Sequence, residues 1–508
     1  MSTRELKTTS LSALGVALTI LGAARCGGGS SATPASSFDA GASTDSAASP
    51  DDASDSSSAI DAPSGDSASF DAASYALYIG ARFNIEGATT DDYVVFDDTA
   101  TGIVRAMPIA GGAATMIATY DVNGNHSVKV DGFVAVVSDG PSITVWSSSV
   151  APRTIPAATF FGATSDGQYI GYVANLTVTD AGTVGDAVLA KTDGSSVVTL
   201  EAGVVASSSG CSPGFFVTPS LYVGAFLCSD AEASSGAQDL YAYAIPSGTK
   251  SELAPNVSLF DVSLDATGKN IAVNRSDGVA SVVTYGVGSV PIESNVADAR
   301  MTPDGANVVY ETTGGALKIA SATTGIPKTL IAAGVTGIAD PSRDSKWMLG
   351  SVAPADAGDD AGSTDVTALI SLIDGASEAL GQLSPGPFTT DVSYAIVLNP
   401  PSAFSAAPVD GGALIPITNQ TAITSQTSSY LFPGAGARVV IESEAIAADG
   451  GVSGYFDLSV IDLAKPNPSK VALGTGTDGT LALSHALDKV AFAQTAGPTP
   501  GVYVAPIP

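Results

Sequence analysis

The feature of this sequence that most constrains its fold is the recurrence of short apolar runs between clusters of turn-forming residues. From Ser74 onward, runs of four to eight alternating or fully apolar residues are separated by Gly, Pro, Asp and Ser. Such runs are typical of β-strands. Helical periodicity is scarce, and the nearest helical candidate, Leu481–Ala491, is equally compatible with a turn between two strands. We therefore expect an all-β chain. The expected strands include Tyr75–Gly80, Tyr93–Phe96, Phe133–Val137, Tyr169–Val173, Leu221–Leu227, Ile271–Val273, Val308–Tyr310, Val439–Glu442 and Val490–Ala493.

The strands recur as a module that begins with a polar turn and continues through two longer strands to a short final one. The clearest copies span Thr164–Leu200 and Thr302–Ile331. The turns at Thr267, Asp304 and Asp344 follow one another at spacings of 37 and 40 residues. This spacing is close to the period of four-stranded propeller blades.

Two of these turns carry a family resemblance. Pro303-Asp304-Gly305 and Ser165-Asp166-Gly167 resemble the turn of TolB-like and related WD-type β-propeller repeats. The stretch Gly102–Gly112 is similar to the strand and turn of other exported propellers. The resemblance implies a β-propeller of four-stranded blades over residues 74–508. The sequence departs from TolB in having a Ser/Ala/Asp/Gly tract, not an α/β domain, ahead of the repeats.

The number of blades follows less directly from the sequence. At about 44 residues per blade the repeat region would hold nearly ten blades, whereas propellers usually have 4–8. We favour eight blades with long loops, with seven blades or a larger ring as alternatives. The last strand, Gly501–Ile507, should close the ring by pairing with a strand near Tyr75–Phe83.

The first 25 residues have the layout of a secretory signal peptide. Arg4 and Lys7 precede an apolar run, Leu11–Ala24, which is shorter than the roughly 20 residues that span a bilayer. Cys26 follows, and the arrangement resembles a bacterial lipoprotein signal, in which this cysteine is acylated. Arg25 stands where that pattern has a small residue. The alternative is ordinary cleavage near Ala23 or Ala24, which releases a soluble protein. We expect export to the periplasm or the outer cell surface, with a lipid anchor at Cys26.

Composition separates the next segment from the repeats. Residues 26–73 are mostly Ser, Ala, Asp and Gly, which cannot bury enough surface to offset their ordering entropy, so we expect a disordered tether. A similar acidic stretch, 353–365, is expected to be a flexible loop. The chain has 20 Lys and Arg against 50 Asp and Glu, a net charge of −30. Such a charge disfavours nucleic acid and anionic lipid surfaces as partners.

The sequence offers little for nucleophilic or zinc chemistry. His126 and His485 are the two histidines, and no serine lies in a Gly-x-Ser-x-Gly elbow. We expect both histidines to be partly exposed turn or strand residues. Gly474–Gly479 fits G-x-G-x-x-G, but an alternating, strand-like run follows it where a dinucleotide site needs a helix. We interpret this run as a turn between strands.

Two further motifs have a structural and a functional interpretation. Asp121–Asn125 has the alternating oxygen ligands of a calcium loop, but Gly132 stands where the bidentate carboxylate belongs, so a hairpin turn is favoured over calcium. Trp146 and Trp347 are expected in blade cores, with a glycan-stacking platform as the alternative. No catalytic residue, metal or cofactor is predicted.

Cys211 and Cys228 are expected to form a disulfide. With Cys26 acylated, they remain as a pair in an oxidising compartment. The runs Phe215–Val217 and Leu221–Leu227 flank a turn signal midway between the two cysteines. A hairpin with its tip there sets them opposite each other, within disulfide reach. The alternative is two free, buried cysteines.

Taken together, these observations predict an exported propeller that binds a protein, peptide or glycan without catalysis. The alternatives are a propeller enzyme, such as a calcium-dependent lactonase or lyase with carboxylates in the central channel, and a passive envelope protein. The sequence predicts no specific ligand.

Overall fold

The computed structural model describes residues 75–508 except for gaps at 80–81, 180–181, 208–214, 219–220, 225–236, 276, 354–364, 400–402, 418–428, 447–451 and 497–498. The described residues form 38 β-strands and no helix, which confirms the all-β expectation. Accordingly, this part of the chain has no helix long and apolar enough to cross a membrane. The expected tether, most of the acidic loop 353–365, and Cys26, Cys211 and Cys228 lie outside the described residues.

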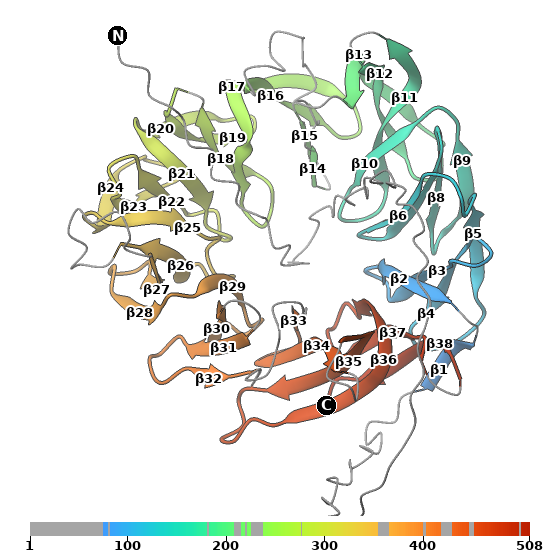
Figure 1. Ribbon diagram of the computed structural model, residues 1–508. Helices are drawn as coiled ribbons and strands as arrows, with labels where there is room; N and C mark the ends of the chain where they lie inside the picture. Colours follow the sequence, from blue (N-terminus) through green and yellow to red (C-terminus); the bar gives the residue numbers. More distant parts are fainter. Residues whose placement is uncertain are drawn as a thin grey trace, which may run out of the picture.

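The strands form antiparallel sheets arranged as a ring, with the first strand of each blade near the axis and the fourth at the rim (Figure 1). The first blade consists of β2 (Phe83–Ala88), β3 (Tyr93–Asp98), β4 (Ile103–Pro108) and β5 (Thr115–Thr119). The second consists of β6 (His126–Asp131), β7 (Val134–Asp139), β8 (Ser142–Ser147) and β9 (Val150–Ile155). The third consists of β10 (Thr159–Ala163), β11 (Tyr169–Thr179), β12 (Gly182–Lys191) and β13 (Val197–Ser207). The next sheet contains β14 (Phe215–Thr218), β15 (Leu221–Gly224), β16 (Ala237–Ala244), β17 (Thr249–Leu264), β18 (Asn270–Arg275), β19 (Ala280–Thr284) and β20 (Gly288–Glu293).

The second half of the chain continues the same way. Its first four-stranded blade consists of β21 (Val296–Met301), β22 (Asn307–Thr312), β23 (Leu317–Ser321) and β24 (Pro327–Ile331). The next consists of β25 (Val335–Ile338), β26 (Trp347–Val352), β27 (Val366–Ser371) and β28 (Ser377–Gly381). The one after it consists of β29 (Ser384–Phe388), β30 (Tyr394–Asn399), β31 (Ala403–Pro408) and β32 (Ile415–Pro416). The final sheet contains β33 (Ser429–Pro433), β34 (Arg438–Ile446), β35 (Val452–Asp462), β36 (Lys470–Leu483), β37 (Lys489–Gln494), β38 (Gly501–Pro506) and β1 (Tyr75–Ile79).

Two long strands each belong to two blades. The first part of β17 pairs with β16 as the outer strand of one blade, and its last residues pair with β18 as the inner strand of the next. The strand β36 changes partners from β35 to β37 in the same way, at Thr477. The eight sheets therefore contain ten four-stranded blades. The eight blades favoured from the sequence equal the number of separate sheets. The number of blades in the structure corresponds to the larger ring, which the sequence analysis gave as an alternative.

The hydrophobic core confirms this count. Ten clusters of buried apolar side chains occur among the described residues, and each lies between two successive blades. Each β-strand turns alternate side chains toward the two neighbouring blades. For example, Val94 and Phe96 of β3 pack toward the tenth blade, and Val95 packs toward the second.

The ring is closed by pairing between the two ends of the repeat region. Tyr75 of β1 is opposite Val504 of β38, and Ile79 is opposite Gly501. This pairing confirms the expected closure. It makes β1 the outer strand of the tenth blade, while β2 begins the first blade beside it (Figure 1).

The chain passes through the same series of sheets twice. Three four-stranded sheets are followed by a seven-stranded one in both halves, Phe83–Glu293 and Val296–Pro506, with β1 completing the second seven-stranded sheet; the two halves have the same number of residues. A matching hydrogen bond follows the second strand of each half. The N–H of Thr99 donates to the carbonyl of Arg82 at 3.2 Å, and that of Thr313 donates to the carbonyl of Asn295 at 2.8 Å. The two halves thus offer equivalent positions for comparison.

A hydroxyl group organises the turn between the first two strands of several blades. The hydroxyl of Thr302 donates to Asp304 at 2.6 Å and accepts the N–H of Asn307 at 3.0 Å. Equivalent bonds are made by Thr89, Thr164, Ser342 and Thr389. These bonds explain why the Thr/Ser-x-Asp signal recurs along the sequence.

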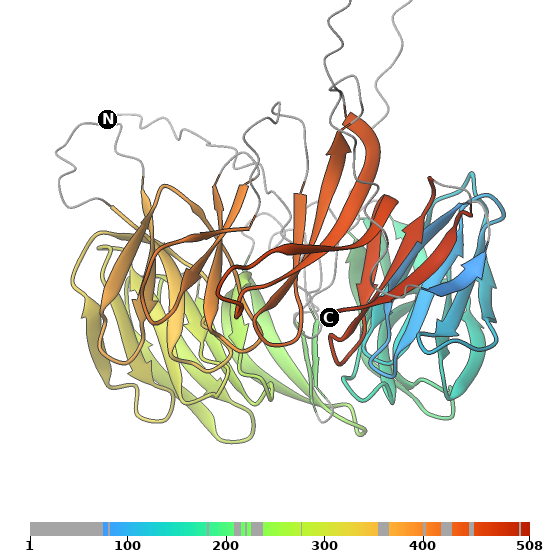
Figure 2. The ribbon, with the colours of Figure 1, turned by 90° about the horizontal axis from the view of Figure 1, so that it is seen from below.

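One hairpin extends beyond the rest of the ring. The strands β34 and β35 are longer than most second and third strands, and they rise from one face of the molecule (Figure 2, orange-red). The base of this hairpin lies beside β36, where that strand changes blades. This arrangement brings three successive blades together at one place, the seam between the tenth blade and the first.

Candidate functional site

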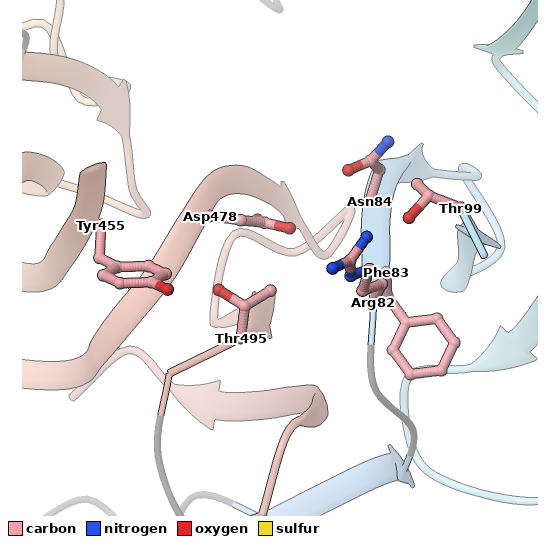
Figure 3. Close-up of a pocket in the computed structure, with 7 residues that line it drawn as sticks. All are labelled: Arg82, Phe83, Asn84, Thr99, Tyr455, Asp478 and Thr495. Carbon is pink, nitrogen blue, oxygen red and sulfur yellow. The ribbon is translucent and has the colours of Figure 1, made fainter. Parts of the chain in front are cut away.

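A pocket of about 420 Å³ lies where the tenth blade meets the first. Figure 3 shows the carboxylate of Asp478 directed from β36 toward Asn84 and Arg82 on the opposite wall. The residues that line it are Arg82, Phe83, Asn84 and Thr99 of the first blade, Tyr455 of β35, Asp478 of β36, and Thr495, which follows β37. The lining thus combines residues almost four hundred positions apart in the sequence, and ring closure is what brings them together.

Asp478 owes its position to the glycines around it. Gly476 and Gly479 have φ angles of +67° and +85°, in the region that favours glycine. A Cβ atom at Gly479 would lie 2.8 Å from the ring of Phe456. The G-x-G-x-x-G run therefore lies within β36, where the strand changes partners. It is not the turn between two strands that the sequence suggested. The second half of β36 follows it, in agreement with the strand-like pattern there.

The environment of Asp478 holds its carboxyl group near the point of half protonation at mildly acidic pH. Burial raises the pKa of Asp478 to about 6, and the nearby Asp97 carboxylate contributes to the rise in pKa. The hydroxyl and N–H of Thr480 donate to Oδ1 at 2.6 and 3.1 Å, which opposes this rise. A group of this kind can accept hydrogen bonds as a carboxylate or donate one as an acid.

A second buried carboxyl group lies behind the pocket. Asp97 of β3 is only 1% exposed and stands opposite Asn84, whose side chain lines the pocket. It accepts a short hydrogen bond from the hydroxyl of Tyr120. Burial raises the pKa of Asp97, and this hydrogen bond acts in the opposite direction. The Tyr120 ring is stacked on His126, with centroids 3.6 Å apart, so the outer end of this network is an exposed histidine.

The remaining lining residues supply hydrogen-bonding groups and one aromatic face. The hydroxyl of Thr495 is shielded from solvent and has no hydrogen-bond partner within the part of the chain that the structure describes. Tyr455 is 41% exposed, although most of the described large apolar side chains are buried. Arg82 is exposed and supplies a cation on the wall opposite Asp478. A ligand in this pocket would therefore meet donors, acceptors and the exposed ring of Tyr455, while the second aromatic residue of the lining, Phe83, is buried.

The structure places the residues that the sequence singled out mostly in structural roles. Trp146 is 3% exposed, in the core between the first two blades, and Trp347 packs at the core between the seventh and eighth. His126 begins β6, and His485 lies in the turn before β37; both are exposed. Each of these expectations is confirmed. None of the four residues lines the pocket.

A turn is present at Asp121–Asn125, but it connects β5 of the first blade to β6 of the second, so it is not the hairpin turn that the Asn-Gly pair suggested. The N–H of Gly124 donates to the carbonyl of Asp121 at 2.9 Å, and the N–H of Asn123 donates to its Oδ1 at 3.0 Å. Across the described part of the chain, no three His, Cys, Asp or Glu side chains lie close enough together to hold a metal ion.

Sequence reasoning missed the buried polar residues that occupy one repeated position. Asp97, Asn274, Glu311 and Glu442 are each the fifth residue of the second strand of a blade, and each is at most 9% exposed. Glu442 accepts a hydrogen bond from Thr477, and Asn274 donates to the carbonyl of Val296 on the next blade. The signal was an acid or amide that ends a run of apolar residues, as in Val94–Asp97 and Val308–Glu311.

Comparison with known proteins yields distant structural likenesses. No protein-family model and no curated protein matches the sequence. Three β-propeller structures are similar: the tricorn protease (12% identity, TM-score 0.23, covering 84% of this chain and 52% of that chain), TolB from Acinetobacter baumannii (13%, 0.28, 61% and 81%), and an oligogalacturonate lyase in complex with manganese (12%, 0.26, 54% and 94%). The chain thus spans about half the length of the tricorn protease. The strand topology itself establishes the propeller.

Proposed function

We propose that this protein is a non-catalytic binding module whose ligand, a segment of a protein, a peptide or a glycan, enters the pocket between the tenth and first blades. The observation that carries the proposal is the pocket lining. It combines a partly buried carboxyl group at Asp478, an opposing cation at Arg82 and an exposed ring at Tyr455. Few, convergent polar groups around a concave surface are the usual composition of a ligand site.

The proposed setting is outside the cytoplasm. The basic start, the short apolar run and Cys26 support export and a lipid anchor, and the composition of residues 26–73 supports a tether that holds the ring away from the membrane. Replacing Cys26 by Ser tests the anchor. The variant should lose incorporation of labelled fatty acid and move from the membrane fraction to the soluble fraction. Unchanged labelling would contradict the anchor.

The binding proposal is tested by titration of defined probes into purified protein. The probes are neutral oligosaccharides, oligosaccharides of uronic acids, and short peptides with free termini, and calorimetry measures the dissociation constant. Asp478→Asn should weaken binding of the probe by about tenfold, because a hydrogen bond to a charged group contributes about 1.5–3 kcal/mol. Asp410→Asn, an exposed carboxylate in the turn before β32, is the matched control and should leave binding unchanged. Equal affinity of the two variants for every probe would contradict the proposal.

A carboxylate enzyme is the second candidate, and the position of Asp478 favours it. A carboxyl group with a pKa of about 6 in a pocket is suited to general acid–base catalysis near neutral pH. Turnover of any of the bound probes, lost in Asp478→Asn and retained in Asp410→Asn, would establish this candidate in place of the first.

A further inference from the structure

The pocket lining is matched to hydroxyl groups. Hydroxyls both donate and accept hydrogen bonds, and so do the side chains of Asn84, Thr99 and Thr495. Asp478 can accept from a hydroxyl as a carboxylate or donate to one as an acid. Among the described residues the shielded hydroxyl of Thr495 has no hydrogen-bond partner, so a ligand hydroxyl there would satisfy it.

The exposed ring on the pocket wall adds a second element. The side chain of Tyr455 is 41% exposed and lies at the base of the projecting β34–β35 hairpin. Figure 3 shows its ring on the same side of the pocket as Asp478. A tyrosine ring offers a rigid, flat apolar surface with a polar tip. A ligand that is flat and apolar on one face and hydroxylated around its edge complements this arrangement.

Charge and size limit the ligand further. The net charge of −30 and the two neighbouring carboxyl groups of Asp97 and Asp478 disfavour a polyanion. A volume of about 420 Å³ is in the lower part of the usual range for small-ligand sites. The pocket therefore suits one small unit of a longer molecule.

We infer that the pocket holds a neutral saccharide unit of a glycan, with Tyr455 against the apolar face of the sugar ring and with Asp478, Asn84 and Thr495 hydrogen-bonded to its hydroxyls. This inference rests on the proposed binding function and narrows its ligand class. The stacking platform is thus Tyr455, and the two tryptophans serve the blade cores.

The test uses the same probes with variants of Tyr455. Neutral oligosaccharides should bind, Tyr455→Ala should weaken their binding by about tenfold or more, and Tyr455→Phe, which keeps the ring, should stay within about threefold of the parent. Saturation-transfer NMR should show the strongest transfer to the ring C–H protons of the sugar. The melting temperature of each variant, measured alongside, separates a change of the site from a change of the fold.

The outcomes distinguish a failure of the saccharide inference from a failure of the proposed binding function. If only uronic acid oligosaccharides or peptides bind, and binding depends on Asp478, the saccharide inference is wrong while the binding function stands. If neutral saccharides bind but Tyr455→Ala has no effect on folded protein, the stacking role is wrong. If no probe binds in a way that depends on Asp478, both the inference and the proposed function fail.

Discussion

The guanidinium group of Arg105 lies over the ring of Tyr78, with its Cζ atom 5.3 Å from the ring centroid. Arg105 belongs to the first blade, and Tyr78 belongs to the strand that completes the tenth. The Tyr78 ring also contacts Phe83 and Phe96 of the first blade, at centroid distances of 5.5 and 5.4 Å. These contacts hold the closing strand against the beginning of the ring.

Removal of this ring should therefore loosen the closure. Tyr78→Ala should lower the free energy of unfolding by about 2 kcal/mol, through the loss of a partly buried aromatic contact and a cation–π contact. Urea denaturation measures the change. Ile79→Ala, at a neighbouring side chain that is 63% exposed, is the control and should change the stability by less than about 0.5 kcal/mol. Similar effects of the two substitutions would argue against a closing role for Tyr78.

The architecture was largely predictable from the sequence because blade strands carry a local signal. Alternation and turn residues located most of the strands, and the pairing of Gly501–Ile507 with the region of Tyr75 was expected correctly. The ten blades were harder to count. In the turns between the first and second strands of the first, seventh, eighth and tenth blades, the left-handed position is held by Asp92, Ser345, Val392 and Leu487 in place of glycine. These turns therefore lack the glycine found at the equivalent position in Gly167, Gly268, Gly305 and Gly436.

The pocket was not predictable in the same way. Its walls come from Arg82–Thr99 and from Tyr455–Thr495, and no local pattern links segments so far apart. Asp478 lies within the Gly474–Gly479 motif that the sequence singled out. Its place in the pocket lining, however, depends on burial by the neighbouring blades. Burial at a seam depends on the whole ring, so only the structure shows it.

The raised pKa of Asp478 makes a prediction about stability and pH. Its ordinary value is 3.8, and the folded protein raises it to about 6, so the folded state binds the proton more tightly. The contribution of this group to stability is therefore greatest below about pH 4 and is lost as the pH rises through 6. Asp478→Asn should be more stable than the parent by about 2 kcal/mol above pH 7 and nearly equal to it at pH 4. Urea denaturation at pH 4, 5.5 and 7.5 measures the difference, and a pH-independent difference would contradict the account.

The disulfide between Cys211 and Cys228 remains a prediction. In the described hairpin, Phe215 pairs with Gly224 and Thr218 pairs with Leu221. Continuing this register outward by four residues on each strand would set 211 opposite 228. A bridge there should contribute roughly 3 kcal/mol. Thiol counting on denatured, unreduced protein should find neither cysteine reactive, and Cys211→Ser should expose one thiol. Two reactive thiols in the parent would mean that the bridge does not form.

Leu487 should be strained by its backbone conformation. Its φ of 57° lies in the left-handed region, where a side chain other than glycine costs about 1–2 kcal/mol. Leu487→Gly should therefore be more stable than Leu487→Ala by about 1 kcal/mol, since both remove the side chain and only glycine relieves the strain. Denaturant unfolding of the two variants gives the comparison, and a more stable alanine variant would show that the turn is not strained.

The most direct test of the pocket as the ligand site is a variant that fills it. Thr99→Trp adds a large ring to the pocket wall, and Thr313→Trp adds the same ring at the equivalent position of the other half of the molecule. Calorimetric titration with the probe that binds the parent most tightly measures the dissociation constant, and melting temperatures confirm that both variants fold. Thr99→Trp should weaken binding by at least about tenfold, and Thr313→Trp should leave it within about twofold. Unchanged affinity in Thr99→Trp, or equal loss in the two variants, would contradict the pocket as the site of binding.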